Sequence, residues 1–87
     1  MDLVQVRWID IASYDGAWMD LGEAKEFKPS VIVTCGWILT HTDEHITLAS
    51  SLSEDKEVVG SVNAIPKGVV LSITPVTLQG LTGNETS

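Results

Sequence analysis

Apolar and polar residues alternate in five segments of the chain, which is the pattern of half-buried β-strands. The clearest segment is LVQVRWIDI at residues 3–11, where Val4, Val6 and Trp8 share one face. The other four segments are residues 30–39, 45–52, 57–65 and 69–73, separated by polar or Pro/Gly-containing turns. Strands and helices do not alternate as a parallel sheet requires, so the pattern predicts an antiparallel one.

One short helix is expected between the first two strands, at about residues 17–28. Asp20 followed three residues later by Glu23 is a capping box, in which the Asp20 carboxylate accepts the N–H of the third helical residue and Glu23 reaches back. Pro29 ends the helix after about two turns, and Gly22 weakens it. We therefore expect packing against the rest of the chain to hold this helix.

The second strand is predicted from the run SVIVTCGWIL at residues 30–39. It is rich in β-branched and apolar residues, so we expect a largely buried strand. Gly36 in its middle indicates a bend, a bulge or a close backbone approach. Cys35 is expected to be a small buried hydrophobe rather than a nucleophile, since no histidine is placed by sequence to activate it.

Length and composition predict a single small globular domain. The chain has 87 residues, of which 44% are apolar and 20% charged. The longest apolar stretch spans residues 31–39, too short to cross a membrane, and the N-terminus lacks a basic segment followed by an apolar run. We expect a cytoplasmic protein, with a domain at residues 1–75 and a polar, flexible tail at residues 76–87.

The charge balance excludes one class of partner. Twelve carboxylates stand against five Lys and Arg residues, a net charge of −7. Binding of duplex DNA through a broad basic face needs clustered cations, so we expect none.

Two short motifs in the second half of the chain resemble those of the Sm/LSm family. The first is Gly36 with the apolar residues 37–39, followed by DEHITL at residues 43–48. The second is IPKG at residues 65–68, followed by an apolar strand at residues 69–73. The resemblance covers about residues 30–74, and the chain is also similar to small Sm-like proteins encoded by tailed phages, including cyanophages.

The resemblance implies an all-β fold, namely a small five-stranded Sm-like (SH3-like) open barrel with one short helix inserted between the first two strands. It also implies a homo-oligomeric ring of about five to seven subunits. The compartment would be the cytoplasm of a bacterial host if the protein is phage-encoded. Self-assembly would cover the edge strands that such a small domain leaves unpaired.

The family's RNA contacts carry over by position to four residues. His45 takes the position whose side chain stacks on a base, and Thr47 takes that of an asparagine that binds base edges. Lys67, beside Gly68, takes the basic position. The resemblance thus implies a non-enzymatic ring that binds single-stranded RNA at its pore, without catalytic residues, metal or cofactor. Thr47 cannot make the paired donor–acceptor contact of an amide.

His41 and His45 also fit the order H-x-x-E-H of inverted zinc peptidases. That chemistry needs both histidines on one face of a helix and a third ligand, whereas these two flank a polar turn between predicted strands. We therefore do not expect a catalytic zinc site.

Trp18 follows an Asp-Gly turn near Tyr14, and two interpretations stay open for it. It either staples the helical insert onto the barrel or contacts another subunit or partner. Acidic groups at residues 43–44 and 54–57 serve solubility or form an acidic face. The alternative function is therefore a protein-interaction module that docks an acidic, aromatic surface on a host protein.

Overall fold

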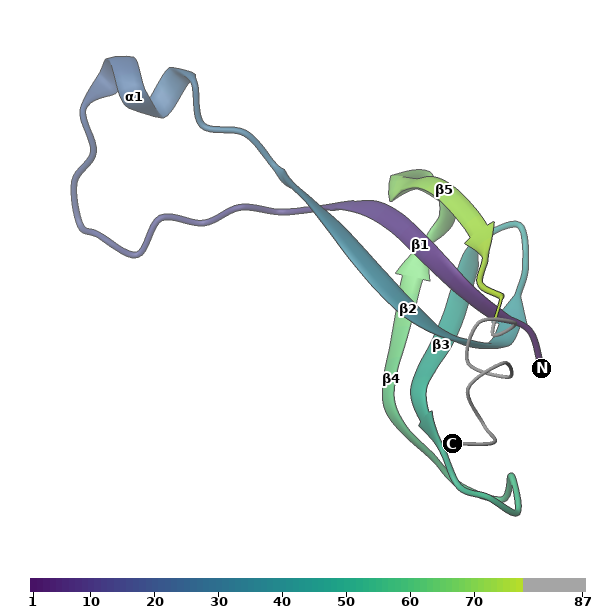
Figure 1. Cartoon of the computed structure of the whole chain (residues 1–87). Coiled ribbons are helices and arrows are strands. Elements are labelled where there is room, and N and C mark those ends of the chain that lie inside the picture. Colours follow the sequence, from purple (N-terminus) through teal and green to yellow (C-terminus); the bar gives the residue numbers. More distant parts are fainter. Residues whose placement is uncertain (78–87) are drawn as a thin grey trace, which may run out of the picture.

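Five antiparallel strands form one sheet in the order β4-β3-β2-β1-β5. This computed structural model describes residues 1–77 (Figure 1). Helix α1 lies between β1 and β2, and the 3-10 turn η1 joins β4 to β5. The predicted fold class, all-β with five strands and one short helix, is confirmed. The elements are β1 (Leu3–Asp10), α1 (Leu21–Lys25), β2 (Ser30–His41), β3 (His45–Leu52), β4 (Val59–Pro66), η1 (Lys67–Val69) and β5 (Val70–Pro75).

The sheet curves strongly but does not close into a barrel. Within residues 1–77, β4 pairs with β3 alone and β5 pairs with β1 alone, so both edges of the sheet remain free. The chain leaves β5 at Val76, whose N–H donates to the carbonyl of Leu3 at 3.0 Å. The rest of the expected tail, residues 78–87, lies outside the described residues. In the described part, no helix has the length and apolar character needed to cross a bilayer.

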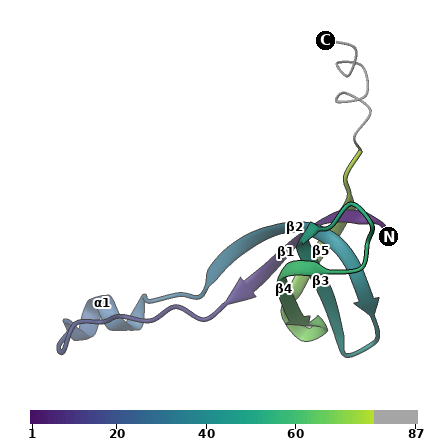
Figure 2. The same cartoon turned by 90° about the horizontal axis from the view of Figure 1, so that it is seen from below.

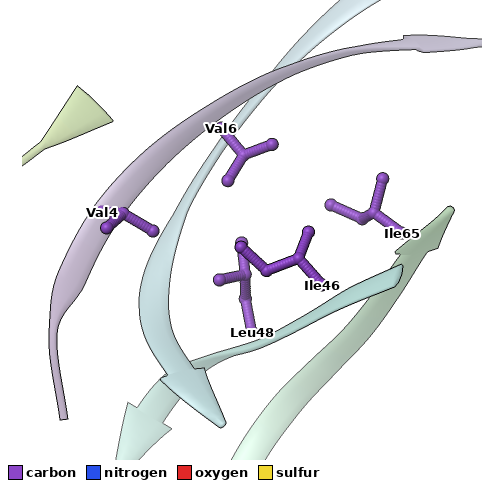
Figure 3. Packing of buried hydrophobic residues seen from close by; sticks show 5 residues of the cluster. All are labelled: Val4, Val6, Ile46, Leu48 and Ile65. Carbon is purple, nitrogen blue, oxygen red and sulfur yellow. The ribbon is translucent and has the colours of Figure 1, made fainter. Parts of the chain in front are cut away.

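A small core holds the curved sheet together. Val4 and Val6 of β1 face Ile46 and Leu48 of β3 and Ile65 of β4, and the five side chains converge in Figure 3. Burial of each such side chain contributes about 1.5–3 kcal/mol. Val4 and Val6 therefore lie on the core face of β1, which confirms the face predicted from the alternation of apolar and polar residues.

Gly36 allows β2 and β3 to approach closely, one of the three outcomes its position predicted. A Cβ atom at Gly36 would lie 2.8 Å from the carbonyl oxygen of Ala49. A bulge follows directly, because the β2–β3 register shifts between Ile38 and Thr40. Together these features bend the sheet around the core.

The prediction that β2 is largely buried is wrong. Val31, Val33 and Cys35 are exposed, because strand alternation puts them on the face of β2 opposite the buried Gly36, which pairs with Val4 of the core. A sheet that packs its core against one face leaves the other face to solvent. The apolar content of the run was therefore a misleading sign of burial.

The connection between β1 and β2 projects from the core as an arm, defined here as residues 9–33. Figures 1 and 2 show the ribbon running outward and carrying α1 at its far end. The radius of gyration of 17.4 Å exceeds the about 12 Å expected for a compact chain of this length. The arm holds no buried residue, so the expectation that packing holds the helix is wrong.

Helix α1 is shorter than predicted, with five residues. Asp20 is its N-cap as expected, but the carboxylate accepts the N–H of Gly22, the second helical residue, at 3.0 Å. Residues 27–29 lie outside the helix, consistent with the effect of Pro29 on the residue before it. The cap begins the helix, and the absence of packing keeps it at about one turn.

Candidate functional site

The two motifs meet at one end of the sheet, in a surface that we call the rim. The rim consists of residues 41–45, at the turn between β2 and β3, and residues 66–68, where β4 passes into η1. His45 pairs with Pro66 across the β3–β4 ladder. The N–H of Lys67 donates to the carbonyl of Glu44 at 2.8 Å. Antiparallel pairing therefore fixes the second motif against the turn of the first.

The side chain of Lys67 contacts His41. Its Nζ lies 2.7 Å from Nε2 of His41, close enough for a direct hydrogen bond. The lysine ammonium has donors and no acceptor, so His41 must accept through an unprotonated Nε2. His41 is exposed and Lys67 is half-buried, which leaves the pair accessible to solvent.

The resemblance places Lys67 together with His45 as an RNA contact and gives no such role to His41. The β2–β3 register could have revealed the partner, since His41 pairs with Ile46 and thus lies toward the core side of the sheet. The missing information was the bulge between Ile38 and Thr40, which shifts that register by one residue.

His45 is held by the turn that precedes it. The hydroxyl of Thr42 accepts the N–H groups of Glu44 and His45, each at 3.1 Å, and lies 3.4 Å from Nδ1 of His45. The N–H of Thr42 donates to the carbonyl of His45 at 2.9 Å. A threonine hydroxyl that caps its own turn in this way fixes the half-buried imidazole at the rim.

Thr47 lies further along β3, where it pairs with Thr40 of β2 and Ala64 of β4. Strand alternation puts His45 and Thr47 on the side of β3 opposite the buried Ile46. Of the four predicted RNA contacts, His45 and Thr47 therefore share a face, whereas the side chain of Lys67 meets His41.

Gly68 is exposed, and a Cβ atom there would meet nothing within 4 Å. A residue with a Cβ atom would therefore fit at this position without a steric clash. Its place beside Lys67 among the RNA-binding positions stays an expectation of the resemblance.

The rim brings together three of the seven His, Lys and Arg residues of the chain. Both histidines and one of the five Lys and Arg residues are here. Two carboxylates, of Asp43 and Glu44, are exposed in the same turn. The rim can thus offer one ammonium and two imidazoles to a ligand, with two negative charges beside them.

Cavities and metal-type clusters are absent from the part of the chain that the structure describes. Among residues 1–77, no cavity is found and no group of three or more His, Cys, Asp or Glu side chains is arranged to hold a metal. His41 and His45 lie on strands on either side of a turn, not on one helix face as the zinc motif requires. Comparisons with family models, with curated proteins and with solved structures give no match.

Proposed function

We propose that this chain is a non-enzymatic, Sm-like protein of the phage-encoded kind that assembles into a ring and binds single-stranded RNA at the rim. The observation that carries the proposal is the meeting of the two motifs at the rim, with Lys67 held beside His41 and the turn of His45. An imidazole face can stack on a splayed base, and an ammonium can contact a phosphate.

Assembly is supported by the two free edges of the sheet. β4 and β5 each have one hydrogen-bonded neighbour within the described chain, and they lie at opposite ends of the strand order. Pairing of β4 in one copy with β5 in the next would satisfy both edges in a head-to-tail assembly. Val62 of β4 and Leu71 of β5 are about half exposed, at 51% and 48%, and would gain cover.

Assembly is also needed for useful RNA affinity. A single subunit offers one rim lysine against the repulsion of a chain of net charge −7. A ring of about five to seven subunits repeats that lysine and both histidines around one axis, so a short RNA strand can engage several copies at once.

The test combines mass and binding measurements on the full chain. Light scattering coupled to size exclusion should give a discrete species of about five to seven times the 9.4 kDa subunit. Fluorescence anisotropy with labelled ten-nucleotide uridine and adenine oligomers then measures RNA affinity. We expect Lys67→Ala to weaken binding by about tenfold or more and to reduce the salt dependence.

Lys25→Ala is the matched control, because Lys25 is an exposed lysine of α1, away from the rim. It should change the affinity less than about twofold. An assembled protein that binds neither oligomer would refute the RNA part of the proposal, and equal losses in the two variants would refute the rim as its location. A 9.4 kDa monomer would refute the ring.

A further inference from the structure

The arm tip, defined as residues 14–24, exposes large apolar side chains to solvent. Trp18 is 89% exposed and Leu21 is 68% exposed. The expectation that Trp18 staples the insert onto the core is therefore wrong, because the tip lies at the far end of the arm (Figures 1 and 2). A nearly bare tryptophan on a projecting element is a feature of interaction sites.

A few local contacts shape the tip. The carboxylate of Asp20 caps α1, and the N–H of Ala24 donates to the carbonyl of Asp20 at 2.9 Å. The ring of Tyr14 occupies the space where a Cβ atom at Gly16 would lie, so glycine lets the aromatic ring fold over the backbone. None of these contacts covers the indole of Trp18, which stays exposed.

The charge of the arm tip indicates which class of partner it can bind. Residues 14–28, which include all of α1, contain four carboxylates and two lysines, and the three carboxylates of residues 14–24 precede both lysines. Asp15 and Glu23 make no side-chain hydrogen bond or ion pair within the described part of the chain, so their charges are free to act outward. Nucleic acid and anionic lipid carry the same sign of charge as the tip and would be repelled. Pairing of two tips is also disfavoured, because a second tip carries the same three carboxylates in residues 14–24.

We propose that the arm tip is a protein-docking element that inserts Trp18 into an apolar pocket of a partner protein whose rim carries Lys and Arg side chains. Burial of the indole supplies affinity, and the basic rim pairs with Asp15 and Glu23 and steers the encounter. This surface is separate from the rim that we assign to RNA, so the inference does not depend on RNA binding; it rests on the proposed function only for the bacterial source of the partner.

The test uses the full chain, labelled with biotin at its N-terminus, on an array of purified bacterial proteins. Wild type, Trp18→Ala and Val58→Ala are compared. Val58 is the matched control, since it is an exposed apolar residue, at 66%, in the turn between β3 and β4. We expect at least one identified protein to bind wild type, to lose about tenfold or more in affinity with Trp18→Ala, and to lose less than about twofold with Val58→Ala.

Two further measurements test the charge argument on each identified pair. The double variant Asp15→Lys, Glu23→Lys should weaken binding by about tenfold at low salt, and the loss should shrink as salt rises. Cross-links from position 18 should fall within a segment of the partner that carries Lys or Arg. The Trp18→Ala variant should keep its RNA affinity, so failure of docking and failure of RNA binding are separate results.

Three results would overturn the inference. One is an array on which no protein distinguishes wild type from Trp18→Ala. Another is binding that depends on Trp18 but whose partner is a second copy of this chain, seen in sedimentation velocity, or a vesicle of phosphatidylglycerol. The third is a cross-linked partner surface without basic residues.

Discussion

At the scale of single residues, Gly36 is where the backbone leaves no room for a side chain. A Cβ atom there would lie 2.8 Å from the carbonyl oxygen of Ala49 and 3.2 Å from Cβ of Leu48. Both neighbours belong to the paired strand β3, so neither can move without disturbing the ladder. We expect Gly36→Ala to lower the free energy of unfolding by about 1–3 kcal/mol.

Urea unfolding followed by circular dichroism measures this effect. Gly60→Ala is the control, because the nearest atom to its added Cβ, Cβ of Ser51, lies at an ordinary 3.5 Å. That variant should be neutral or stabilised by about 0.4–1 kcal/mol, since alanine restricts the unfolded chain. Equal stability of Gly36→Ala and wild type would show that the strands separate easily at this point.

Asp55 lies in a turn whose hydrogen bonds change its acidity. The hydroxyl of Ser53 donates to its carboxylate at 2.7 Å, and the N–H of Glu57 donates at 3.0 Å. The hydrogen bond from Ser53, reinforced by that from Glu57, lowers the pKa of the Asp55 carboxyl. The ionised form therefore stabilises the turn between β3 and β4.

This predicts a pH dependence of the turn. Because the pKa is lower in the folded chain, the stabilisation is full above the unfolded value of about 3.9 and is lost as pH falls through the folded value. In an NMR titration, the amide of Glu57 should report a midpoint below about 3.9. Asp55→Asn should abolish that transition, and a midpoint at or above 3.9 would contradict the hydrogen-bond assignment.

At the scale of elements, the arm and the sheet have different sources of stability. The sheet is held by the core of Val4, Val6, Ile46, Leu48 and Ile65, whereas the arm buries none of its residues. An isolated ribbon and a one-turn helix are marginal in water by themselves. The arm should therefore open locally at low free energy while the core persists.

Shortening of the arm tests this separation. Asp10 and Ser30 are paired across β1 and β2, so an Asn-Gly turn can replace residues 11–29 and close the ribbon as a two-residue hairpin. We expect the free energy of unfolding to stay the same or to rise by up to about 2 kcal/mol, because the long loop no longer has to be closed. A clear loss of stability in urea unfolding would show that the arm packs on the core.

At the scale of the whole molecule, the free edges determine how copies can associate. A charged side chain on an edge strand opposes strand pairing between molecules. We expect Val62→Lys on β4 to shift the mass measured by light scattering toward the 9.4 kDa subunit while circular dichroism stays unchanged. Val58→Lys places the same charge in the neighbouring turn, outside the strand, and should leave the mass as in wild type.

If Val62→Lys assembles as well as Val58→Lys, β4 is not part of the contact between copies. Association through another surface, such as the arm, would then have to account for any assembled mass. The arm-shortened chain described above would distinguish that case, since it lacks residues 11–29 and keeps both edges.

The sequence by itself determined the features that depend on near neighbours. Alternation identified the five strands and placed Val4 and Val6 toward the core, and an aspartate before the helix identified its first residue. The negative net charge also follows from composition alone, and with it the expectation that the chain does not bind duplex DNA through a broad basic face. These features were predictable because side-chain periodicity and capping act within a few residues.

Only the tertiary structure decided which surfaces face solvent and which distant residues meet. The apolar run of β2 predicted burial, but Val31 and Val33 lie on the solvent face of the strand, and Trp18 is 89% exposed in the arm. Lys67 meets His41 because a bulge after Ile38 resets the β2–β3 register. Burial and register depend on contacts between segments far apart in the chain, and local patterns carry no information on them.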